Sequence, residues 1–349
     1  MRRVVSAAVI GAALLLAGCS SSSSSSSSAS GSTASSTAAA SAPVTVRLGF
    51  LTNITHSSAL IGLKEGFFTK ALGSAATLKP TAFSTGTEET TALLAGQLDA
   101  AYVGPNPAIN AWQKSNGSAI KIISGAATGG ASVVVTKGIT SAAQLKGKTL
   151  ATPSLGNTQD VALRAWLKQN GLTTTSTGGG DAFIKPTTPN SAAVLEFKSG
   201  QVAGGSEPAP YDVEMVNDGG TVLLSEPGVT TLLVVTQSFL SAHPAVVSDL
   251  LKAQVQANGF IKSNPAAAQA DANAELASYT GKPLKASIIA ASFKEITFTN
   301  DPDAASLKTD ADQAVSLGLL KPVDLTGIFD LGPLNQVLAA AGQQQVSSS

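Results

Sequence analysis

The sequence of 349 residues contains one cysteine, two histidines and only 5% aromatic residues, and these shortages exclude several classes of function. With Cys19 as its single cysteine, the chain forms no internal disulfide and no cluster of metal-binding thiolates. The two histidines, His56 and His243, are too far apart in sequence to suggest a local pair of metal ligands. No glycine-rich loop ends in Lys-Ser or Lys-Thr, and no Gly-x-Ser-x-Gly motif is present. The sequence therefore argues against an enzyme and predicts neither a cofactor nor a metal.

Charged residues are also scarce, at 13% of the chain, and the two signs balance at 22 basic and 22 acidic residues. A nucleic-acid-binding protein would normally show a basic field, so this balance argues against that class. The polar character comes from Ser, Thr, Asn, Gln and Gly, which are neutral hydrogen-bonding residues. Beyond the N-terminal segment, arginine occurs only at Arg47 and Arg164.

The N-terminus has the pattern of a secretion signal. Arg2 and Arg3 precede an apolar run at residues 4–16 that is too short to cross a bilayer as a helix. Residues 15–19 read Leu-Leu-Ala-Gly-Cys and resemble the lipobox of bacterial lipoproteins, in which the cysteine becomes the lipidated N-terminus. We therefore predict a lipoprotein signal peptide at 1–18 and a lipid on Cys19; a spare thiol behind an ordinary signal peptide is the alternative.

Residues 19–43 are rich in Ser and Ala and contain nothing that could form a core. Such a composition predicts a flexible tether. Removing Arg2 and Arg3 with the signal peptide leaves 22 − 2 = 20 basic against 22 acidic residues, a formal charge of −2. We expect an extracytoplasmic domain, lipid-anchored to the outer face of the cytoplasmic membrane.

From residue 44 onward, predicted strands alternate with predicted helices. Strands are expected at 44–50, 77–83 and 99–103, and each is followed by a loop and a helix, at 59–64, 88–95 and 108–114. Asn106 is expected to cap the last of these helices, with Pro107 at its first position. This alternation is typical of an α/β fold with a mostly parallel sheet, in which ligands bind at the carboxyl ends of the strands.

The pattern restarts near residue 141, which indicates a second lobe. Strands are predicted at 120–124 and 132–136, with a glycine-containing loop at 125–131 between them. Beyond residue 238 the chain is mostly helical, with helices expected at 246–262, 265–279, 283–294, 310–320 and 331–341. We predict that these helices pack on the first lobe, so that lobe 1 comprises 44–131 and 232–346, and lobe 2 comprises 132–231.

The stretch at residues 155–166 predicts a polar turn that leads directly into a helix. Asn157 or Thr158 caps the first turn, and Gly156 permits close approach of the backbone. The free amides and positive dipole end of such a helix favour an anion, although an ordinary cap after a strand has the same pattern. Arg164 lies about two turns into the helix, and the pattern leaves open whether it contacts a ligand.

Three other loops carry small neutral donors ahead of a helix, around Asn53, Thr85 and Asn106. Together with the loop at Asn157, they are expected to place several amide and hydroxyl donors around one small oxyanion. His56 lies in the first of these loops and is a candidate ligand contact, with a surface or capping role as the alternative. The residues therefore favour binding of an anion over catalysis, and they do not name the anion.

Several stretches resemble the substrate-binding lipoproteins of ABC importers for aliphatic sulfonates, nitrate and taurine. They lie at residues 46–56, 62–68, 93–104, 145–151 and 155–160. The resemblance implies a two-lobe fold of the type II periplasmic-binding-protein kind, in which each lobe is a mostly parallel sheet flanked by helices. Two crossing segments would form the hinge, and the lobes would close over a ligand and present it to a membrane permease.

The resemblance also implies contact residues, which come from both lobes and from the crossing segment. They fall on Asn53, Thr85, Gly86, Asn106, Gly130, Ser132, Asn157, Thr158 and Gln159. Where such proteins often show Pro-Glu-Pro-Trp, this chain has Pro208-Ala-Pro-Tyr211, with Ala203 at an aspartate position. Tyr211 is therefore the candidate for the aromatic contact, and the surface around a ligand tail is expected to be less aromatic.

Our hypothesis is a monomeric binding protein that captures a small organic anion for an ABC permease, with an aliphatic sulfonate as the favoured ligand. The alternatives are nitrate, taurine or a flat pyrimidine precursor of thiamine, which would need aromatic stacking. Only Tyr102, Trp112, Trp166 and Tyr211 are placed to supply such stacking. An enzyme on the same fold is a further alternative, but it would need metal or cysteine chemistry that the chain after Cys19 lacks.

Overall fold

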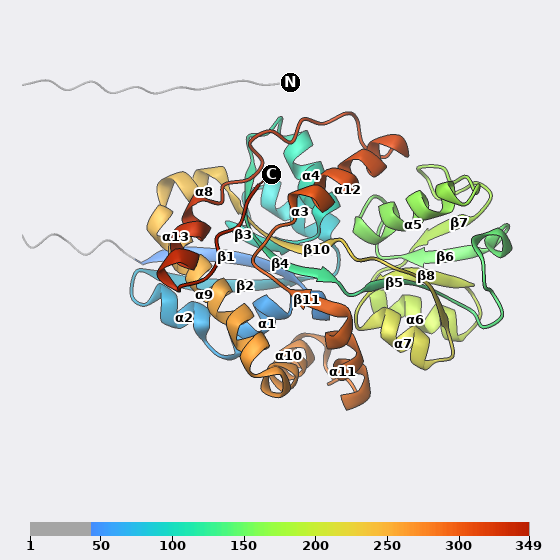
Figure 1. Cartoon of the computed structure of the whole chain (residues 1–349), viewed down its shortest axis with the longest axis horizontal. Helices are drawn as coiled ribbons and strands as arrows, with labels where there is room; N and C mark the ends of the chain where they lie inside the picture. Colours follow the sequence, from blue (N-terminus) through green and yellow to red (C-terminus); the bar gives the residue numbers. More distant parts are fainter. Residues whose placement is uncertain (1–42, 349) are drawn as a thin grey trace, which may run out of the picture. The chain divides into compact units, whose positions relative to one another are not determined.

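The computed structural model describes residues 43–348 (Figure 1). The predicted signal peptide, Cys19 and all of the predicted tether except Pro43 lie outside the described residues. Two mixed sheets with helices on their faces make up the described chain. Each sheet with its helices is one lobe.

The first sheet has the strand order β11-β4-β10-β3-β1-β2 and forms the centre of lobe 1. β1 runs parallel to β2 and β3, whereas β10 runs antiparallel to β3 and β4. The strands are β1 (Val44–Leu51), β2 (Ala76–Phe83), β3 (Ala100–Val103), β4 (Ile120–Gly129), β10 (Val229–Thr236) and β11 (Ile296–Phe298).

The second sheet has the order β7-β6-β8-β5-β9 and forms the centre of lobe 2. β6 is parallel to β7 and β8, and β5 is antiparallel to β8 and β9. The strands are β5 (Ala131–Val135), β6 (Thr149–Thr152), β7 (Phe183–Pro186), β8 (Gly204–Pro208) and β9 (Thr221–Ser225).

This arrangement confirms the predicted two-lobe α/β class with mostly parallel sheets, since β1, β2, β3 and β4 run in one direction in the first sheet and β6, β7, β8 and β9 do so in the second. β5 and β10 each arrive directly from the other lobe, without a helical crossover of the kind that joins parallel neighbours. Both strands therefore run antiparallel to the two strands they pair with.

The chain passes between the sheets twice. The first passage is at Gly130, where β4 leads into β5, and the second is between β9 and β10. Gly129 and Gly130 have φ angles of 71° and 73°, which favour glycine. A Cβ on Gly130 would lie 2.3 Å from Ile296 Cγ1, so this crossing also requires the absence of a side chain.

The predicted loop at 125–131 is wrong, because β4 continues as a strand to Gly129. Gly125 allows a close approach instead of a turn: a Cβ there would lie 2.0 Å from the carbonyl oxygen of Asp301. The glycines in this segment therefore mark tight packing against the chain in and around β11.

Helices cover both faces of each sheet. In lobe 1 the core on one face includes residues of α1, α9 and α10, and that on the other face includes residues of α4 and α12. The elements are η1 (Ile54–His56), α1 (Ser57–Lys64), α2 (Phe67–Leu72), α3 (Gly86–Leu94), α4 (Pro105–Lys114), α8 (Gln237–Ala242), α9 (Pro244–Ser263), α10 (Pro265–Thr280), α11 (Ala286–Glu295), α12 (Ala304–Ser316) and α13 (Gly332–Ala340).

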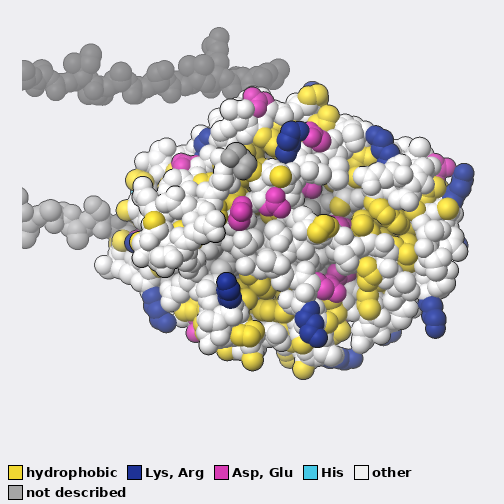
Figure 2. Space-filling view, in the orientation of Figure 1, with side chains coloured by type: hydrophobic (Ala, Val, Ile, Leu, Met, Phe, Trp, Pro, Cys, Tyr) yellow, Lys and Arg dark blue, Asp and Glu magenta, His cyan; other side chains and the backbone are white. Residues whose placement is uncertain are grey.

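In lobe 2, α5 packs on one face of the second sheet, and α6 and α7 pack on the other (Figure 1). The elements are η2 (Ala142–Leu145), α5 (Thr158–Gln169), α6 (Asn190–Lys198) and α7 (Tyr211–Asn217). Across residues 43–348, every helix is too short or too polar to span a bilayer. Figure 2 shows charged side chains dispersed over a mostly neutral face, as the composition predicts.

Candidate functional site

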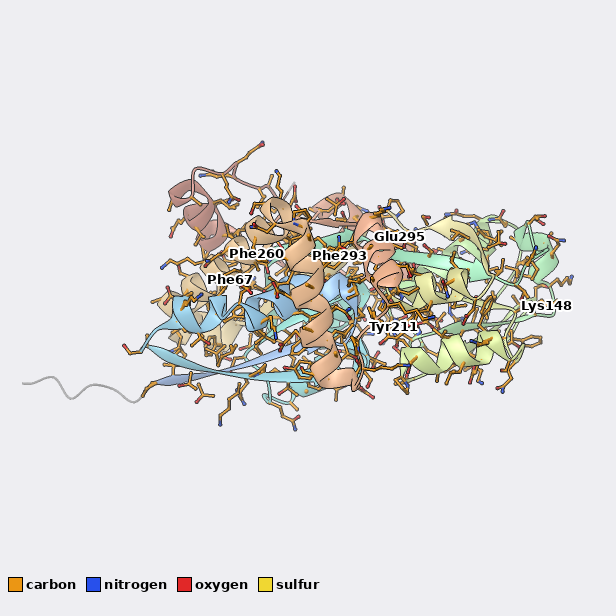
Figure 3. The ribbon with its side chains drawn as sticks, turned by 90° about the horizontal axis from the view of Figure 1, so that it is seen from below. Phe67, Lys148, Tyr211, Phe260, Phe293 and Glu295 are labelled. Atoms are coloured by element: carbon orange, nitrogen blue, oxygen red, sulfur yellow. The ribbon has the colours of Figure 1, made fainter. Side chains whose placement is uncertain are left out.

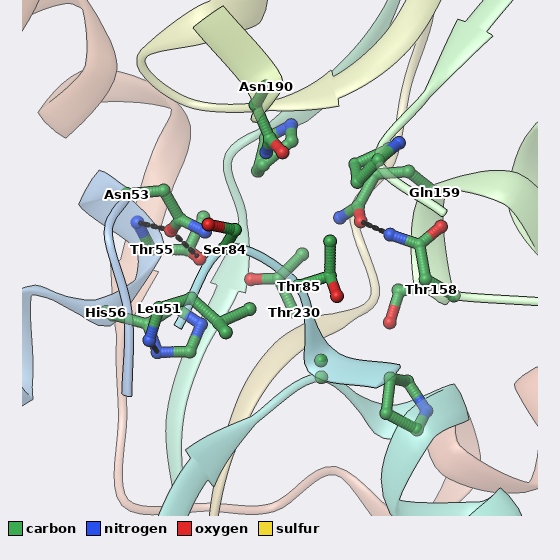
Figure 4. Close-up of a pocket in the computed structure, with 16 residues that line it drawn as sticks. Leu51, Asn53, Thr55, His56, Ser84, Thr85, Thr158, Gln159, Asn190 and Thr230 are labelled. Carbon is green, nitrogen blue, oxygen red and sulfur yellow. Dashed lines mark hydrogen bonds between the residues drawn. The ribbon is translucent and has the colours of Figure 1, made fainter. Parts of the chain in front are cut away.

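Loops from both lobes meet at a narrow pocket between the two sheets (Figure 4). The pocket has a cavity volume of about 20 Å³, so the two lobes lie close together in this structure. Its walls are Leu51, Asn53, Thr55, His56, Ser84, Thr85, Gly86, Gly104, Pro107, Pro153, Asn157, Thr158, Gln159, Asn190, Pro208 and Thr230. These walls contain no lysine, arginine, aspartate or glutamate.

Two lobe 1 side chains in the pocket are fixed by capping hydrogen bonds. Asn53 caps η1, and its Oδ1 accepts from Thr55 N (3.0 Å) and Thr55 Oγ1 (2.7 Å). Thr85 caps α3, and its Oγ1 accepts from Glu88 N at 3.3 Å. Because these acceptor atoms are already engaged, the Asn53 amide N–H and the Thr85 hydroxyl hydrogen are the groups left to bind a ligand.

The lobe 2 wall is fixed in the same way. Asn157 caps α5, which selects it over Thr158 as the capping residue: its Oδ1 accepts from Asp160 N at 2.9 Å. Its Nδ2 donates to Gln159 Oε1 at 3.0 Å. The two amides thereby hold each other's orientation, and the Nε2 group of Gln159 remains as a donor.

His56 adds a neutral donor. Its Nδ1 accepts from Leu51 N at 3.2 Å, so the neutral ring carries its proton on Nε2. The side chain is 1% exposed, and burial lowers the pKa of His56 to about 3. His56 therefore stays uncharged at physiological pH and presents an Nε2–H group as a donor.

Helix starts from both lobes point at the same pocket. In α5 the first intrahelical bond runs from Val161 N to Asn157 O, so the N–H groups of Thr158 and Gln159 are not used within the helix. α3 begins at Gly86, also in the pocket wall. The lobes are close here, since a Cβ on Gly104 would lie 2.6 Å from Thr158 Oγ1. Neutral donors and two helix dipoles make this an environment for an oxyanion.

Seven of the eleven sequence-predicted ligand contacts line this pocket: Asn53, His56, Thr85, Gly86, Asn157, Thr158 and Gln159. Gly130, Ser132, Tyr211 and Asn106 do not. Gly130 packs beside Ile296 at the crossing, and Ser132 lies opposite Glu207 in the second sheet.

The prediction that Asn106 caps α4 is wrong. Gly104 is the N-cap and Pro105 takes the first helical position. Either proline of the Pro-Asn-Pro sequence has the backbone angle that this position requires, so the sequence pattern alone does not show which of the two begins the helix. Asn106 thus lies inside the helix, where its Nδ2 donates to the carbonyl oxygen of Asp310 at 3.3 Å.

Sequence reasoning missed several wall residues, among them the polar residues Asn190 and Thr230. Asn190 begins α6, is 6% exposed, and its buried Oδ1 has no hydrogen-bond partner in the described chain. Its position at the start of a helix, where a polar side chain is common, was a usable signal. Thr230 lies inside β10, and nothing in its sequence neighbourhood separates it from a core residue.

Arg164, whose role the sequence left open, is not in the pocket wall. It is 1% exposed, and its Nε donates to Asp160 Oδ2 at 2.8 Å. Asp160 also accepts from Gly156 N at 2.8 Å and from Thr152 Oγ1 at 3.2 Å. The Arg164–Asp160 pair therefore holds the turn that presents Asn157.

Tyr211, labelled in Figure 3, bridges the lobes outside the pocket wall. Its hydroxyl donates to the carbonyl oxygen of Thr52 in lobe 1 at 2.9 Å. We expect Tyr211→Phe to remove this bond, worth about 1 kcal/mol, and shift the ligand-free protein toward a more open form. Small-angle X-ray scattering would then show a larger radius of gyration, with Tyr279→Phe on α10 as the control. An unchanged radius in Tyr211→Phe would show that the bond does not hold the lobes together.

A family model described as the NMT1-like family matches residues 39–277, more than half of the chain. The chain belongs to the NMT1-like family. A comparison of this NMT1-like protein with curated proteins found no match.

Solved structures share the fold of this NMT1-like protein at low sequence identity. The alkanesulfonate-binding protein SsuA from Xanthomonas axonopodis pv. citri, bound to MOPS, has a TM-score of 0.70 and 18% identity, over 84% of this chain and 100% of its own. The periplasmic nitrate-binding protein NrtA from Synechocystis PCC 6803 has a TM-score of 0.70 and 15% identity, over 85% and 89%. A Candida albicans protein described as having the generic periplasmic binding protein fold has a TM-score of 0.61 and 13% identity, over 87% and 96%. The predicted fold is thereby confirmed.

Proposed function

We propose that this protein is the extracytoplasmic solute-binding component of an ABC importer. It captures a small organic anion, and an aliphatic sulfonate is the favoured ligand. The observation that supports this most is the pocket between the lobes, which has neutral donors, two helix starts and no charged side chain. The sulfonate- and nitrate-binding proteins that share the fold support the same class of ligand.

The same proposal includes the membrane and the permease as partners. A lipid on Cys19 would hold a monomeric binding protein near the outer face of the cytoplasmic membrane, with residues 19–43 as the tether. The protein would deliver its ligand to the transmembrane subunits of the importer, and it has no catalytic role in this proposal.

Binding is coupled to movement of the lobes. The pocket between the lobes, which we call the anion pocket, is narrow. A ligand therefore enters when the lobes separate and is enclosed when they return. Asn53, His56 and Thr85 come from lobe 1, whereas Asn157, Thr158 and Gln159 come from lobe 2. A ligand that accepts hydrogen bonds from both sets stabilises the closed form over the open form, which sets its affinity.

A charge placed at the pocket wall tests the proposal. Aspartate caps helices as well as asparagine does, so Asn157→Asp keeps the α5 cap while it brings a carboxylate to the proposed anion site. We expect the sulfonate affinity to fall at least tenfold with little change in melting temperature. Asn170→Asp, at the other end of α5, is the matched control.

The measurement is calorimetry after a thermal-shift panel of alkanesulfonates, nitrate, taurine and aminopyrimidines. Stabilisation by alkanesulfonates supports the main proposal, and the small cavity volume keeps nitrate as the second candidate. If no anion stabilises the protein, or if Asn157→Asp binds the sulfonate as tightly as the native chain, the proposed site is wrong.

A further inference from the structure

The two lobes also meet outside the anion pocket, where α7 of lobe 2 packs against α11 of lobe 1. Asp212 lies in the first turn of α7, and Glu295 is the last residue of α11. Backbone contacts hold both helix ends at the first crossing. Ala209 N, just ahead of α7, donates to Gly130 O at 2.8 Å, and a Cβ on Gly129 would lie 2.5 Å from the carbonyl oxygen of Glu295. Rotation of one lobe against the other therefore moves α7 relative to α11.

The side chains of Asp212 and Glu295 form a hydrogen bond between two carboxyl groups. Two ionised carboxylates can only accept, so this bond requires that one of the two carries a proton. Asp212 is 1% exposed, whereas Glu295 is exposed, so the buried Asp212 holds the proton. Asp212 Oδ1 accepts from Val213 N at 2.7 Å, and Oδ2 accepts no hydrogen bond within residues 43–348. Oδ2 is thus the oxygen that can carry the proton.

The titratable groups that face Asp212 are acidic. Burial is the main cause that raises the pKa of Asp212 well above its ordinary value, and Glu295 is the second. Glu226 raises this pKa further. It lies in the segment that returns between β9 and β10, where it lines a cavity of about 350 Å³ together with Asp310 of α12. Glu207 of β8 is 0% exposed, accepts no hydrogen bond in the described chain and also interacts with Asp212.

The lysines on the elements around α7 face other carboxylates. These pairings are Lys282 and Lys285 with Glu214, Lys198 with Asp218, and Lys185 with Glu196. Lys294 is exposed at the end of α11. Among the described residues, acidic neighbours and burial therefore decide how Asp212 titrates, and both favour its protonated form.

Separation of the lobes would end this arrangement. Asp212 would lose Glu295 and gain water, so its pKa would return toward its ordinary value of about 3.9. The closed form therefore binds a proton more tightly than the open form does. The contribution of the bond to closure is fully present below the ordinary pKa, and it is lost as the pH rises through the raised pKa of the closed form.

We propose that Asp212 and Glu295 form a proton-dependent latch between the lobes: a proton on Asp212 holds the closed form, and its loss at higher pH releases the lobes. Capture of a ligand is then coupled to uptake of a proton. The coupling rests on the proposed function, whereas the latch is a property of the two lobes and is tested without a ligand.

Small-angle X-ray scattering of the ligand-free protein tests the latch. We expect the radius of gyration of the native chain to increase between about pH 5 and about pH 9, as the shared proton is lost. Asp212→Asn replaces the protonated carboxyl group with an amide of similar shape, which donates to Glu295 without titrating. It should keep the small radius at every pH. A native radius that does not change, or an equal increase in Asp212→Asn, overturns the proposal.

Two further variants complete the comparison. Glu295→Gln also supplies an amide donor, now to Asp212, and leaves the buried side chain in place, so it decides the question if Asp212→Asn does not fold. Its radius should change by less than about half of the native change, and the full native change would contradict the latch. The control is Asp218→Asn at the other end of α7, whose partner Lys198 lies in the same lobe. It should behave as the native chain does.

Calorimetry with butanesulfonate tests the coupling to the ligand. Titrations in two buffers of different ionisation enthalpy give the number of protons taken up on binding. The native chain should take up as much as one proton more than Asp212→Asn, and its affinity relative to that variant should fall by up to about tenfold for each pH unit. The difference between the two chains cancels the titration of other groups, including His56.

The outcomes separate the latch from the proposed function. If butanesulfonate binds and both chains take up the same number of protons at every pH, the latch is wrong and the proposed function stands. If no sulfonate binds, the proposed function fails, and the scattering result alone decides the latch.

Discussion

Acidification is expected to destabilise the folded protein by up to about 5 kcal/mol through His56 alone. The pKa of this buried ring falls from 6.5 to about 3, so between these values the unfolded chain binds a proton that the folded chain does not. The contribution of neutral His56 to the free energy of unfolding is fully present above pH 6.5. It is lost as the pH falls toward 3, at about 1.4 kcal/mol for each pH unit. Urea denaturation at a series of pH values measures the slope.

Two variants separate the roles of the ring. His56→Asn keeps an acceptor for Leu51 N near the position of the ring Nδ1, and His56→Gln keeps a donor near the position of the ring Nε2. Neither variant has a side chain at position 56 that titrates in this range. The free energy of unfolding of the native chain, minus that of either variant, should therefore grow from pH 3 to 6.5 and then level off. In ligand binding, His56→Gln should retain more affinity than His56→Asn. A difference that does not change with pH would show that His56 titrates in the folded protein as it does in the unfolded chain.

The titration of Glu226 gives a slope of the opposite sign, and Glu226→Gln, which removes it, is an internal control. Because burial raises the pKa of Glu226 from 4.5 to about 7, the folded chain holds a proton that the unfolded chain releases. The native protein then loses up to about 3 kcal/mol at this residue as the pH rises from 4.5 to 7. The variant should remove this loss and leave the acid-side slope of His56 in place.

Replacing Arg164 with Met should lower the free energy of unfolding by about 3–5 kcal/mol. The substitution leaves the carboxylate of Asp160, which is 0% exposed, without its buried positive partner. Gly156 N and Thr152 Oγ1 still donate to Asp160, but neither carries a charge. Urea denaturation at pH 7 gives the change in stability.

The control for Arg164→Met is Lys198→Met, which breaks an ion pair whose lysine side chain is 66% exposed. Exposed pairs contribute about 0–1 kcal/mol, so this variant should be nearly native in stability. An equal, small loss in both variants would show that the Arg164–Asp160 pair does not organise the α5 start.

Features that depend on local chemistry could be predicted from the sequence. The α5 cap at Asn157 and the C-terminal helices follow from capping residues and helical periodicity, which act within a few residues of chain. α12 was the exception, since it begins at Ala304 behind the Asp303 cap instead of at residue 310. The grouping of the Asn53, Thr85 and Asn157 loops in one pocket followed from the rule that strand ends meet at one edge.

Features that depend on distant partners could not be predicted. The glycine at position 125 resembled a loop signal, whereas it serves the approach of Asp301, 176 residues further on. Thr230 reaches the pocket only because β10 returns from lobe 2 to the first sheet. Glu226 and Asp310 are 84 residues apart, and only the packing of α12 beside the returning segment brings them into one cavity.

The position of β10 also determines when lobe 1 can be completed during synthesis. This strand lies between β3 and β4 and pairs with both, so these two strands have no direct contact with each other in the sheet. Residues 229–236 leave the ribosome only after all of lobe 2 has been made. Until then, β3 and β4 lack the strand that joins them, so the sheet of lobe 1 is completed only after the chain has returned from lobe 2.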